Sequence, residues 1–329
     1  MSSSFVIVPR APADAADTLE IDPAFGDLAA HAADPAVTDL FLNGADGLYV
    51  DRGAGAEPVP GWSASEREVR ELAVRLVALG GRHLDDQAPC VDVRLASGVR
   101  VHAVLAPVAV SGTAVSVRIP RVRAGDLDDL ARLGAVDDAQ RRWLESLVQA
   151  RQNVLLTGGT GTGKTTMLAA LLAHVPPHER IVTIEDVAEL RPRHPHHVAL
   201  EARQPNLEGA GAIPVARLVR ESLRMRPDRL IVGECRGEEI RDLLTALNTG
   251  HDGGAGTLHA SGLADVPARL EALGALAGMD PPALARQAVS AFSFVLHLVR
   301  DRSGRRRLAQ AGVLRLHREH LGIEEGRPW

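Results

Sequence analysis

The sequence predicts a two-domain protein of the α/β class, in which a small α+β domain precedes a larger domain built on a mainly parallel sheet. Three observations support this prediction. Hairpin patterns and one helix fill residues 34–119, a glycine-rich loop occupies residues 158–165, and short apolar strands alternate with helices from residue 153 onward. The length of 329 residues suits about two domains. We expect an N-terminal domain over 1–120, a linker over 121–128 and the larger domain over 129–329.

The N-terminal domain is predicted from two hairpins, a helix and a further strand. Strand-like runs separated by turn residues indicate hairpins within 34–50 and 91–105. Between them, Ser65 and Glu68 have the spacing of a capping box, and apolar residues at helical spacing follow. Residues 113–119 predict one more strand. This mixture of local elements is typical of a small α+β domain.

The larger domain is predicted from the alternation of strands and helices. Asp137 and Gln140 have the spacing of a helix cap, and the segments after them are NVLLT, IVTIE and RLIVGE, separated by helical patterns. Such alternation indicates parallel strands joined by crossover helices. Residues 293–316 indicate a hairpin near the C-terminus, and we expect the tail after Leu321 to be frayed.

Composition excludes several classes of protein. A net charge of −5 and a pI near 6.2 argue against a strongly basic nucleic-acid-binding protein. Cys90 and Cys235 provide neither a disulfide framework nor a CxxC pair, so a reducing compartment fits. The first residues lack the pattern of a signal peptide, and no run approaches about 20 uninterrupted apolar residues. We therefore expect a cytoplasmic protein with at most peripheral membrane association.

Residues 158–165, GGTGTGKT, match the phosphate-loop pattern GxxxxGK[ST] in full. They follow an apolar strand and open an apolar helix, which is the context that the pattern requires. The glycines let backbone N–H groups approach phosphate oxygens, and the helix N-terminus adds partial positive charge. Lys164, the only lysine in the chain, supplies a compact cation for the β- and γ-phosphates, and Thr165 is placed to ligand Mg²⁺. The expected nucleotide-binding residues of this loop are Gly158, Gly159, Thr160, Gly161, Thr162, Gly163, Lys164, Thr165 and Thr166.

A phosphate loop alone does not separate kinases, GTPases, helicases and motors. A GTPase is disfavoured, because the base-reading pattern NKxD needs a second lysine. A small-molecule kinase is disfavoured too, since no later segment resembles a lid over an acceptor.

Three later segments decide among the other classes: IVTIEDVAEL, LRMRPDRLIVGECRGEE and TGHDGGAGTLHA follow the phosphate loop in this order. With it they resemble the Walker A, Asp, Walker B and His boxes of the secretion-superfamily ATPases of type II and type IV systems. The sequences of these motifs are most similar to those of the Tad (tight adherence) pilus assembly branch. The resemblance extends into the N-terminal domain through DPAVTDLFLNG and residues 98–121. The tetracysteine module of type II motors cannot be built from two distant cysteines, which favours the Tad or type IV side.

This resemblance implies a RecA-like motor domain that uses ATP and Mg²⁺, with roles for its acidic and histidine residues. Glu234 would orient or deprotonate the attacking water, and Glu185 would face the Mg²⁺–water cluster, with Asp186 supporting the loop. His259 would report the γ-phosphate to the sheet. The structural alternative for the acidic residues is an ordinary acid at a strand end, and for His259 it is a buried core histidine. His251, in the same segment as His259, is explained equally well as a nucleotide-sensing or as a structural histidine.

The resemblance also implies roles for three arginines. Arg220 and Arg224 would reach the γ-phosphate of a neighbouring subunit as arginine fingers, and Arg118 of the N-terminal domain would meet the nucleotide. Arg217, Arg220 and Arg224 have the spacing of one helix face, so a solvated basic face is the alternative. The arginines at 305–307 are expected to be a solvated hairpin tip rather than a lipid or nucleic-acid patch.

His194, His196 and His197 form a histidine-rich tract. No carboxylate or cysteine partner stands nearby at ligand spacing, so we do not expect a metal site there.

The implied function is that of an ATP-hydrolysing motor in a bacterial secretion or Tad-type pilus assembly machine. The resemblance implies a homo-hexamer that acts on inner-membrane platform proteins, with no direct nucleic-acid contact. A nucleic-acid translocase and a nucleotide-gated scaffold with weak hydrolysis are the alternatives. An aromatic content of 3% weighs against the first, because base stacking needs aromatic side chains. The complete set of boxes weighs against the second.

Overall fold

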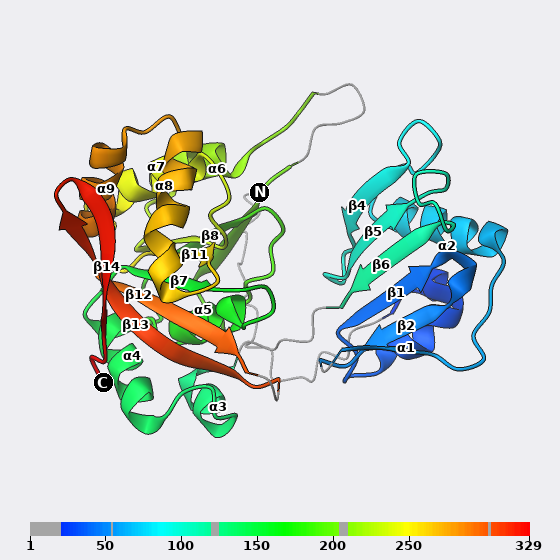
Figure 1. Ribbon diagram of the computed structural model, residues 1–329, viewed down its shortest axis with the longest axis horizontal. Helices are drawn as coiled ribbons and strands as arrows, with labels where there is room; N and C mark the ends of the chain where they lie inside the picture. The colour runs from blue at the N-terminus through cyan, green and yellow to red at the C-terminus, as the bar shows by residue number, and fades with distance from the viewer. Residues whose placement is uncertain (1–20, 54, 120–124, 204–209, 302–303) are drawn as a thin grey trace, which may run out of the picture. The chain divides into compact units, whose positions relative to one another are not determined.

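A computed structural model describes residues 21–53, 55–119, 125–203, 210–301 and 304–329 (Figure 1). The chain divides into two compact units, Met1–Arg121 and Val122–Trp329, and each is described by itself. Residues 121–124 of the expected linker lie outside the described residues. Leu127 and Asp128, at the end of that expected linker, already lie in the first turn of a helix.

The first unit holds, in its described part, a six-stranded antiparallel sheet in the order β3-β2-β1-β6-β5-β4. The strands are β1 Asp39–Asn43, β2 Leu48–Asp51, β3 Ala56–Pro58, β4 Cys90–Arg94, β5 Arg100–Val104 and β6 Ala114–Arg118. The helices are η1 Pro23–Leu28, α1 Ala29–Ala33, η2 Gly44–Asp46 and α2 Glu66–Leu79. Alternate residues of the strands are buried with the apolar stripe of α2, so one face of the sheet forms the core.

The local signals in this unit gave the right elements. Both predicted hairpins are present, as β1–β2 and β4–β5. Ser65 and Glu68 form the predicted capping box at the start of α2, with the Glu68 carboxylate accepting the Ser65 N–H at 2.7 Å. Glu66, in the first turn of the same helix, accepts hydrogen bonds from the N–H and the hydroxyl of Thr113, which fixes the loop before β6.

The second unit is built, in its described part, on an eight-stranded sheet in the order β14-β13-β12-β7-β11-β10-β8-β9. The six strands from β12 to β9 are parallel, and β13 and β14 are antiparallel additions. The strands are β7 Val154–Gly158, β8 Ile181–Glu185, β9 His197–Glu201, β10 Arg229–Val232, β11 Ala255–His259, β12 Phe294–Arg300, β13 Arg306–His317 and β14 His320–Gly326. The α/β class and the mainly parallel sheet are thus confirmed.

Helices cover both faces of this sheet, so the unit has three layers (Figure 1). The helices are α3 Leu127–Arg132, α4 Asp138–Gln149, α5 Lys164–Ala173, α6 Val215–Ser222, η3 Leu223–Met225, α7 Glu239–Leu247, η4 Leu263–Asp265, α8 Val266–Leu276 and α9 Pro281–Ala291. One apolar core joins α6–α9 to the sheet, and a second joins α3–α5 to the opposite face. Strands buried on both faces read as continuous apolar runs, which is why β7, β8 and β10 were recognisable from sequence.

The expected fraying of the C-terminal tail is wrong. Residues 320–326 form β14, which pairs with β13 from His317 opposite His320 to Ala311 opposite Gly326. Arg318 and Glu319 make the connecting turn with positive φ angles of 45° and 74°. Leu321 is buried in the core shared with α8 and α9, and the burial of this apolar side chain stabilises the tail in its paired position.

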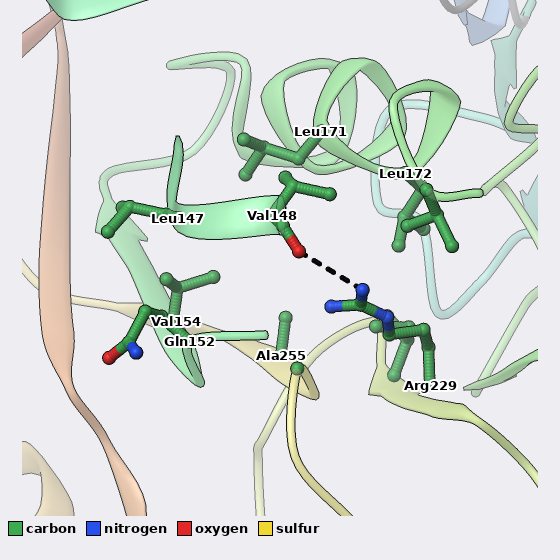
Figure 2. A pocket seen from close by; sticks show the side chains of 11 residues that line it. Leu147, Val148, Gln152, Val154, Leu171, Leu172, Arg229 and Ala255 are labelled. Carbon is green, nitrogen blue, oxygen red and sulfur yellow. Dashed lines mark hydrogen bonds between the residues drawn. The ribbon is translucent and has the colours of Figure 1, made fainter. Parts of the chain in front are cut away.

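A buried ion pair closes the amino-terminal edge of the parallel sheet. The Arg229 side chain is 2% exposed, its Nε donates to Glu179 at 2.6 Å, and Nη1 of Arg151 lies 2.9 Å from the same carboxylate oxygen. Figure 2 shows the guanidinium of Arg229 donating to the carbonyl of Val148 beside an apolar cavity between α4, α5 and the sheet. A Cβ on Gly253 would lie 2.0 Å from the guanidinium, so glycine is required there. One carboxylate therefore compensates a cation that water cannot reach.

Replacing Glu179 with alanine should lower the free energy of unfolding of the second unit by about 3–5 kcal/mol, because it leaves the Arg229 charge buried without its partner. Urea unfolding followed by tryptophan fluorescence would measure the loss. Glu221→Ala is the matched control, since its partner Arg224 is 74% exposed and such surface pairs contribute about 0–1 kcal/mol. Equal, small effects of the two changes would contradict this account of the buried pair.

Candidate nucleotide-binding site

The phosphate loop lies at the carboxyl end of a central strand of the parallel sheet. Strand β7 is flanked by β12 and β11, and it leads through the loop directly into α5, whose first residue is Lys164. Gly161 and Gly163 have φ angles of 72° and 94°, in the left-handed region that favours glycine. A Cβ on Gly158 would meet the backbone oxygen of Leu298 at 2.4 Å, so β12 packs directly against the start of the loop. The sequence motif and its strand–loop–helix context agree.

Lys164 is buried and folded back onto its own loop. Its Nζ donates to the backbone oxygens of Gly158 at 2.9 Å and Gly159 at 3.0 Å. Burial lowers the pKa of this ammonium, and the charge of Glu234 opposes that shift. Carbonyl oxygens are weaker partners for a cation than phosphate oxygens, so an incoming phosphate would compete for the ammonium group.

Glu234 lies two residues beyond β10, beside the phosphate loop. Its Oε1 is 2.6 Å from Nε2 of His259, the last residue of β11, and its Oε2 accepts from Nη2 of Arg236 at 2.5 Å. Oε1 is buried, and no donor in the described part of the chain is aligned for a hydrogen bond to it despite the short distance to His259. Burial, and then the charge of Lys164, lowers the pKa of His259, which favours the neutral imidazole.

These groups form a continuous chain of contacts across the carboxyl ends of four parallel strands, β7, β11, β10 and β8. Nζ of Lys164 is 3.5 Å from Nδ1 of His259, which reaches Glu234, and Arg236 extends the chain to Asp186 at 3.8 Å. The structure therefore brings Lys164, Glu234 and His259 together, as expected of the Walker A, Walker B and His boxes. Sequence reasoning missed Arg236, although it follows the strand-end glutamate by only two residues.

Glu185 ends β8 and is buried, but its carboxylate faces the following loop. It accepts the backbone N–H groups of Glu189 at 3.1 Å and Leu190 at 3.1 and 3.2 Å. A Cβ on Gly233 would lie 2.4 Å from its side chain, so the neighbouring strand passes close by. The geometry shows Glu185 bracing the Asp-box loop. The role of Glu185 beside Mg²⁺ stays a prediction.

The arginines of the second unit that were expected to act on a neighbouring subunit are exposed. Arg217 and Arg220 lie on α6, and Arg224 lies in the 3₁₀ turn that follows it. Arg220 pairs with Asp242 of α7 at 2.6 Å, and Arg224 pairs with Glu221 at 3.1 Å.

Arg118 lies in the first unit, on the solvent face of β6. Its register partners are Asp39 on β1 and Arg100 on β5, and Arg100 in turn faces Arg94 on β4. Three arginines thus follow one another across the sheet. Acidic residues accompany this row, since Asp39 lies opposite Arg118 and Arg100 pairs with Asp92 at 3.5 Å. The local sequence pattern around Arg118 did not reveal this register.

His251 and the three histidines of the histidine-rich tract each contact a different partner. His251 is half-buried, with Nδ1 3.2 Å from the carbonyl of Ala246. In the histidine-rich tract, His194 contacts the carbonyl of Pro176, and His196 lies 3.2 Å from Arg180. The third member, on β9, contacts a threonine hydroxyl of β8, and burial lowers the pKa of His197 to about 4.

The hairpin β12–β13 supports the phosphate loop, and the sequence did not indicate this. Nε of Arg306 donates to the carbonyl of Gly161 at 2.9 Å. On the partner strand, His297 is 2% exposed and its Nδ1 lies 2.9 Å from the hydroxyl of Thr157, one residue before the loop. Residues 305–307 are exposed, as expected of a solvated hairpin tip, and the structure adds the contact of Arg306 with the phosphate loop.

A cavity of about 200 Å³ adjoins the loop and the start of α5. Its lining includes the apolar side chains of Leu130, Met167 and Leu298 and the polar side chains of Thr166 and Arg306. Such a mixture suits the base and ribose of a nucleotide, because a flat apolar ring needs apolar walls and the ribose needs polar partners.

The residues present also fit Mg²⁺. Mg²⁺ takes oxygen ligands and usually retains several waters. Thr165 stands directly after the loop lysine, and Glu234 offers a buried oxygen that lacks an aligned donor within the described residues. A hydrated cation or its water would satisfy this oxygen.

Comparison with known proteins places the chain in a family. The family model described as "Type II/IV secretion system protein" matches residues 27–325. The chain belongs to this family. No helix in the described part of the chain is long and apolar enough to span a membrane.

Relatives and a solved structure extend this finding. A putative conjugal transfer protein of Mycobacterium tuberculosis strain H37Rv is 52% identical over 284 residues, which cover 84% of this chain and 81% of the relative. The conjugal transfer protein TrbB of Rhizobium radiobacter is 31% identical over 280 residues, covering 83% and 82%. The pilus retraction motor PilT with bound ADP matches with a TM-score of 0.62 at 18% identity, over 94% of this chain and 84% of that one. The expected fold, an N-terminal domain with a RecA-like motor domain, is confirmed.

The secretion-family chain offers a matched pair of glycine substitutions in its phosphate loop. Gly158→Ala should lower the affinity for ATP roughly tenfold or more, because the added methyl group meets backbone of β12. Gly161→Ala enters open space and carries only the backbone strain of a positive φ, roughly 1–2 kcal/mol, so it should weaken binding less. Titration with a fluorescent ATP analogue would measure both. A stronger effect at Gly161 would show that β12 does not constrain the loop.

Proposed function

We propose that this chain is the ATP-hydrolysing motor of a bacterial secretion machine, of the Tad-type pilus assembly branch. The observation that carries the proposal is the contact chain of Lys164, His259 and Glu234 at the carboxyl edge of the parallel sheet. A cation, an imidazole and a strand-end carboxylate meet there beside a complete phosphate loop. The family membership and the likeness to the fold of PilT support it.

In the proposed reaction, the loop N–H groups and Lys164 bind the phosphates, with Lys164 leaving the carbonyls of Gly158 and Gly159. Bound Mg²⁺ would neutralise phosphate charge, held by Thr165 and Glu234. Glu234 orients the attacking water and accepts its proton through the oxygen that lacks an aligned donor. A neutral His259 senses the change, because it contacts both Glu234 and Lys164.

The cavity beside α5 is the proposed site of the nucleoside. Leu130, Met167 and Leu298 would pack on the base, while Thr166 and Arg306 would bind the ribose and the α-phosphate. The loop contact of Arg306 then couples the C-terminal hairpin to occupancy of the site.

Force would come from motion of an N-terminal domain, residues 1–120, against a motor domain, residues 129–329. We propose that the chain works as a homo-hexamer in the cytoplasm, docked on platform proteins at the inner membrane. Arg118 would reach nucleotide from the N-terminal domain, and Arg220 and Arg224 would act on the neighbouring subunit's nucleotide. The exposure of all three guanidinium-bearing residues is compatible with such use.

A second candidate is a motor of a conjugation machine, which the names of two relatives favour. Such a motor would act on protein components or on the DNA itself. The acidic pI of about 6.2 and the low aromatic content favour protein components. Stimulation of ATP turnover by single-stranded DNA, lost at moderate salt, would favour DNA instead.

Replacing Glu234 with glutamine should lower the steady-state kcat for ATP roughly 100-fold or more, because the water loses its base. The affinity for ATP should be retained, since the phosphate loop is unchanged and the glutamine amide still offers an oxygen to Mg²⁺. Phosphate release and binding of a fluorescent ATP analogue would be measured on the same samples. Glu238→Gln, an exposed carboxylate four residues further on, is the matched control and should keep wild-type turnover. Intact turnover in Glu234→Gln would refute the assignment.

A further inference from the structure

We propose that Arg236 is a positioning residue for hydrolysis, which holds one oxygen of Glu234 so that the other is directed at the attacking water. This inference rests on the proposed ATPase function and adds to it a residue that is not among those expected from the sequence to be catalytic. Three features support it: the contacts of the carboxylate, the anchored backbone of Arg236 and the charges around the guanidinium.

The two oxygens of Glu234 have different surroundings. Oε2 accepts a hydrogen bond from Nη2 of Arg236 at 2.5 Å. Oε1 is buried on the side of His259, and within the described residues no donor is aligned with it. A carboxylate with one oxygen held cannot rotate freely, so Oε1 keeps its direction toward His259 and, through it, Lys164. The oxygen without an aligned donor is thus the one beside His259, whose other ring nitrogen lies 3.5 Å from Nζ of Lys164.

The backbone that carries Arg236 is itself fixed. Its N–H and that of Gly237 both donate to Oε1 of Glu239, the second at 2.7 Å. Glu239 opens α7 and is 7% exposed, so this anchor belongs to the packed part of the unit. Because the backbone of Arg236 is fixed, only its side chain can move, and this restricts the orientation of its hydrogen bond to Glu234.

Acidic groups keep the guanidinium in place from the other side. Oδ2 of Asp186 lies 3.8 Å from Nη1 of Arg236, and the charges of Asp186 and Glu189 both favour the protonated guanidinium. The hydrogen bond to Glu234 is the main cause that raises the pKa of Arg236, and these two charges add to it. The arginine therefore connects Glu234, in the same loop after β10, to the Asp-box loop after β8.

An ordinary surface ion pair is the competing explanation. The Arg236 side chain is 59% exposed, and exposed pairs contribute little to stability. However, Glu234 is only 20% exposed, and the partner is the proposed base, so orientation rather than stability is the expected contribution.

The test compares Arg236→Ala and Arg236→Lys with the wild-type protein. Arg236→Ala should lower kcat about 10- to 100-fold, the cost expected for losing a partner that orients a reacting ligand, while the Kd of a fluorescent ATP analogue stays within about twofold of wild type. Arg236→Lys should recover part of the loss. Added guanidinium ion at millimolar concentration should raise the kcat of Arg236→Ala and leave wild type unchanged. Arg315→Ala removes an exposed ion pair on β13 and should alter none of these values.

A second readout does not depend on turnover. The melting temperatures of Glu234→Gln, Arg236→Gln and the double variant should be non-additive, because the second change removes a partner already lost. Wild-type kcat in Arg236→Ala, absence of rescue by guanidinium, or additive melting shifts would each overturn the role of Arg236. Failure of the wild-type protein to hydrolyse ATP would instead overturn the proposed function, and the melting cycle would still decide whether the pair interacts.

Discussion

The rest of the site depends on how the buried ammonium of Lys164 is compensated. A buried cation is costly unless it is paired or well hydrogen-bonded, and here two loop carbonyls and the nearby Glu234 provide the compensation. That requirement places the phosphate loop, the end of β10 and the end of β11 close together. His259 fills the space between the two charges with a side chain whose lowered pKa keeps it neutral. The resulting cluster is ready for an anion, since any phosphate offers Lys164 better partners than carbonyl oxygens.

The sheet makes this arrangement possible through its strand order. Carboxyl ends of parallel strands meet at one edge, so residues from β7, β10 and β11 converge although they lie far apart in sequence. The antiparallel hairpin β12–β13 adds support from the side, through the packing of Leu298 on Gly158 and the hydrogen bond of Arg306 to Gly161. The opposite edge is closed by the buried pair of Arg229 and Glu179.

Sequence alone could predict features that depend on neighbouring residues. Lys164 follows from the loop motif, the cap at Ser65 follows from a three-residue spacing, and buried parallel strands follow from apolar runs. Features that depend on pairing between distant segments could not be read in this way. Arg306 reaches Gly161 because β12 lies beside β7, and β14 is held by its pairing with β13 and by the burial of Leu321 against α8 and α9. Arg236 was hidden by composition, since a chain with arginine at so many positions gives no reason to single one out.

Because Lys164 is the only lysine, its side chain can be observed without interference. Protein labelled with ¹³C-lysine should give one ε-methylene signal by NMR, and titration with ATP and Mg²⁺ should shift it as the ammonium leaves the carbonyls of Gly158 and Gly159 for phosphate oxygens. AMP, which lacks the β- and γ-phosphates, should leave the signal near its starting position. A signal that ignores ATP, or that responds equally to AMP, would contradict the claim that this lysine is the phosphate-binding centre of the site.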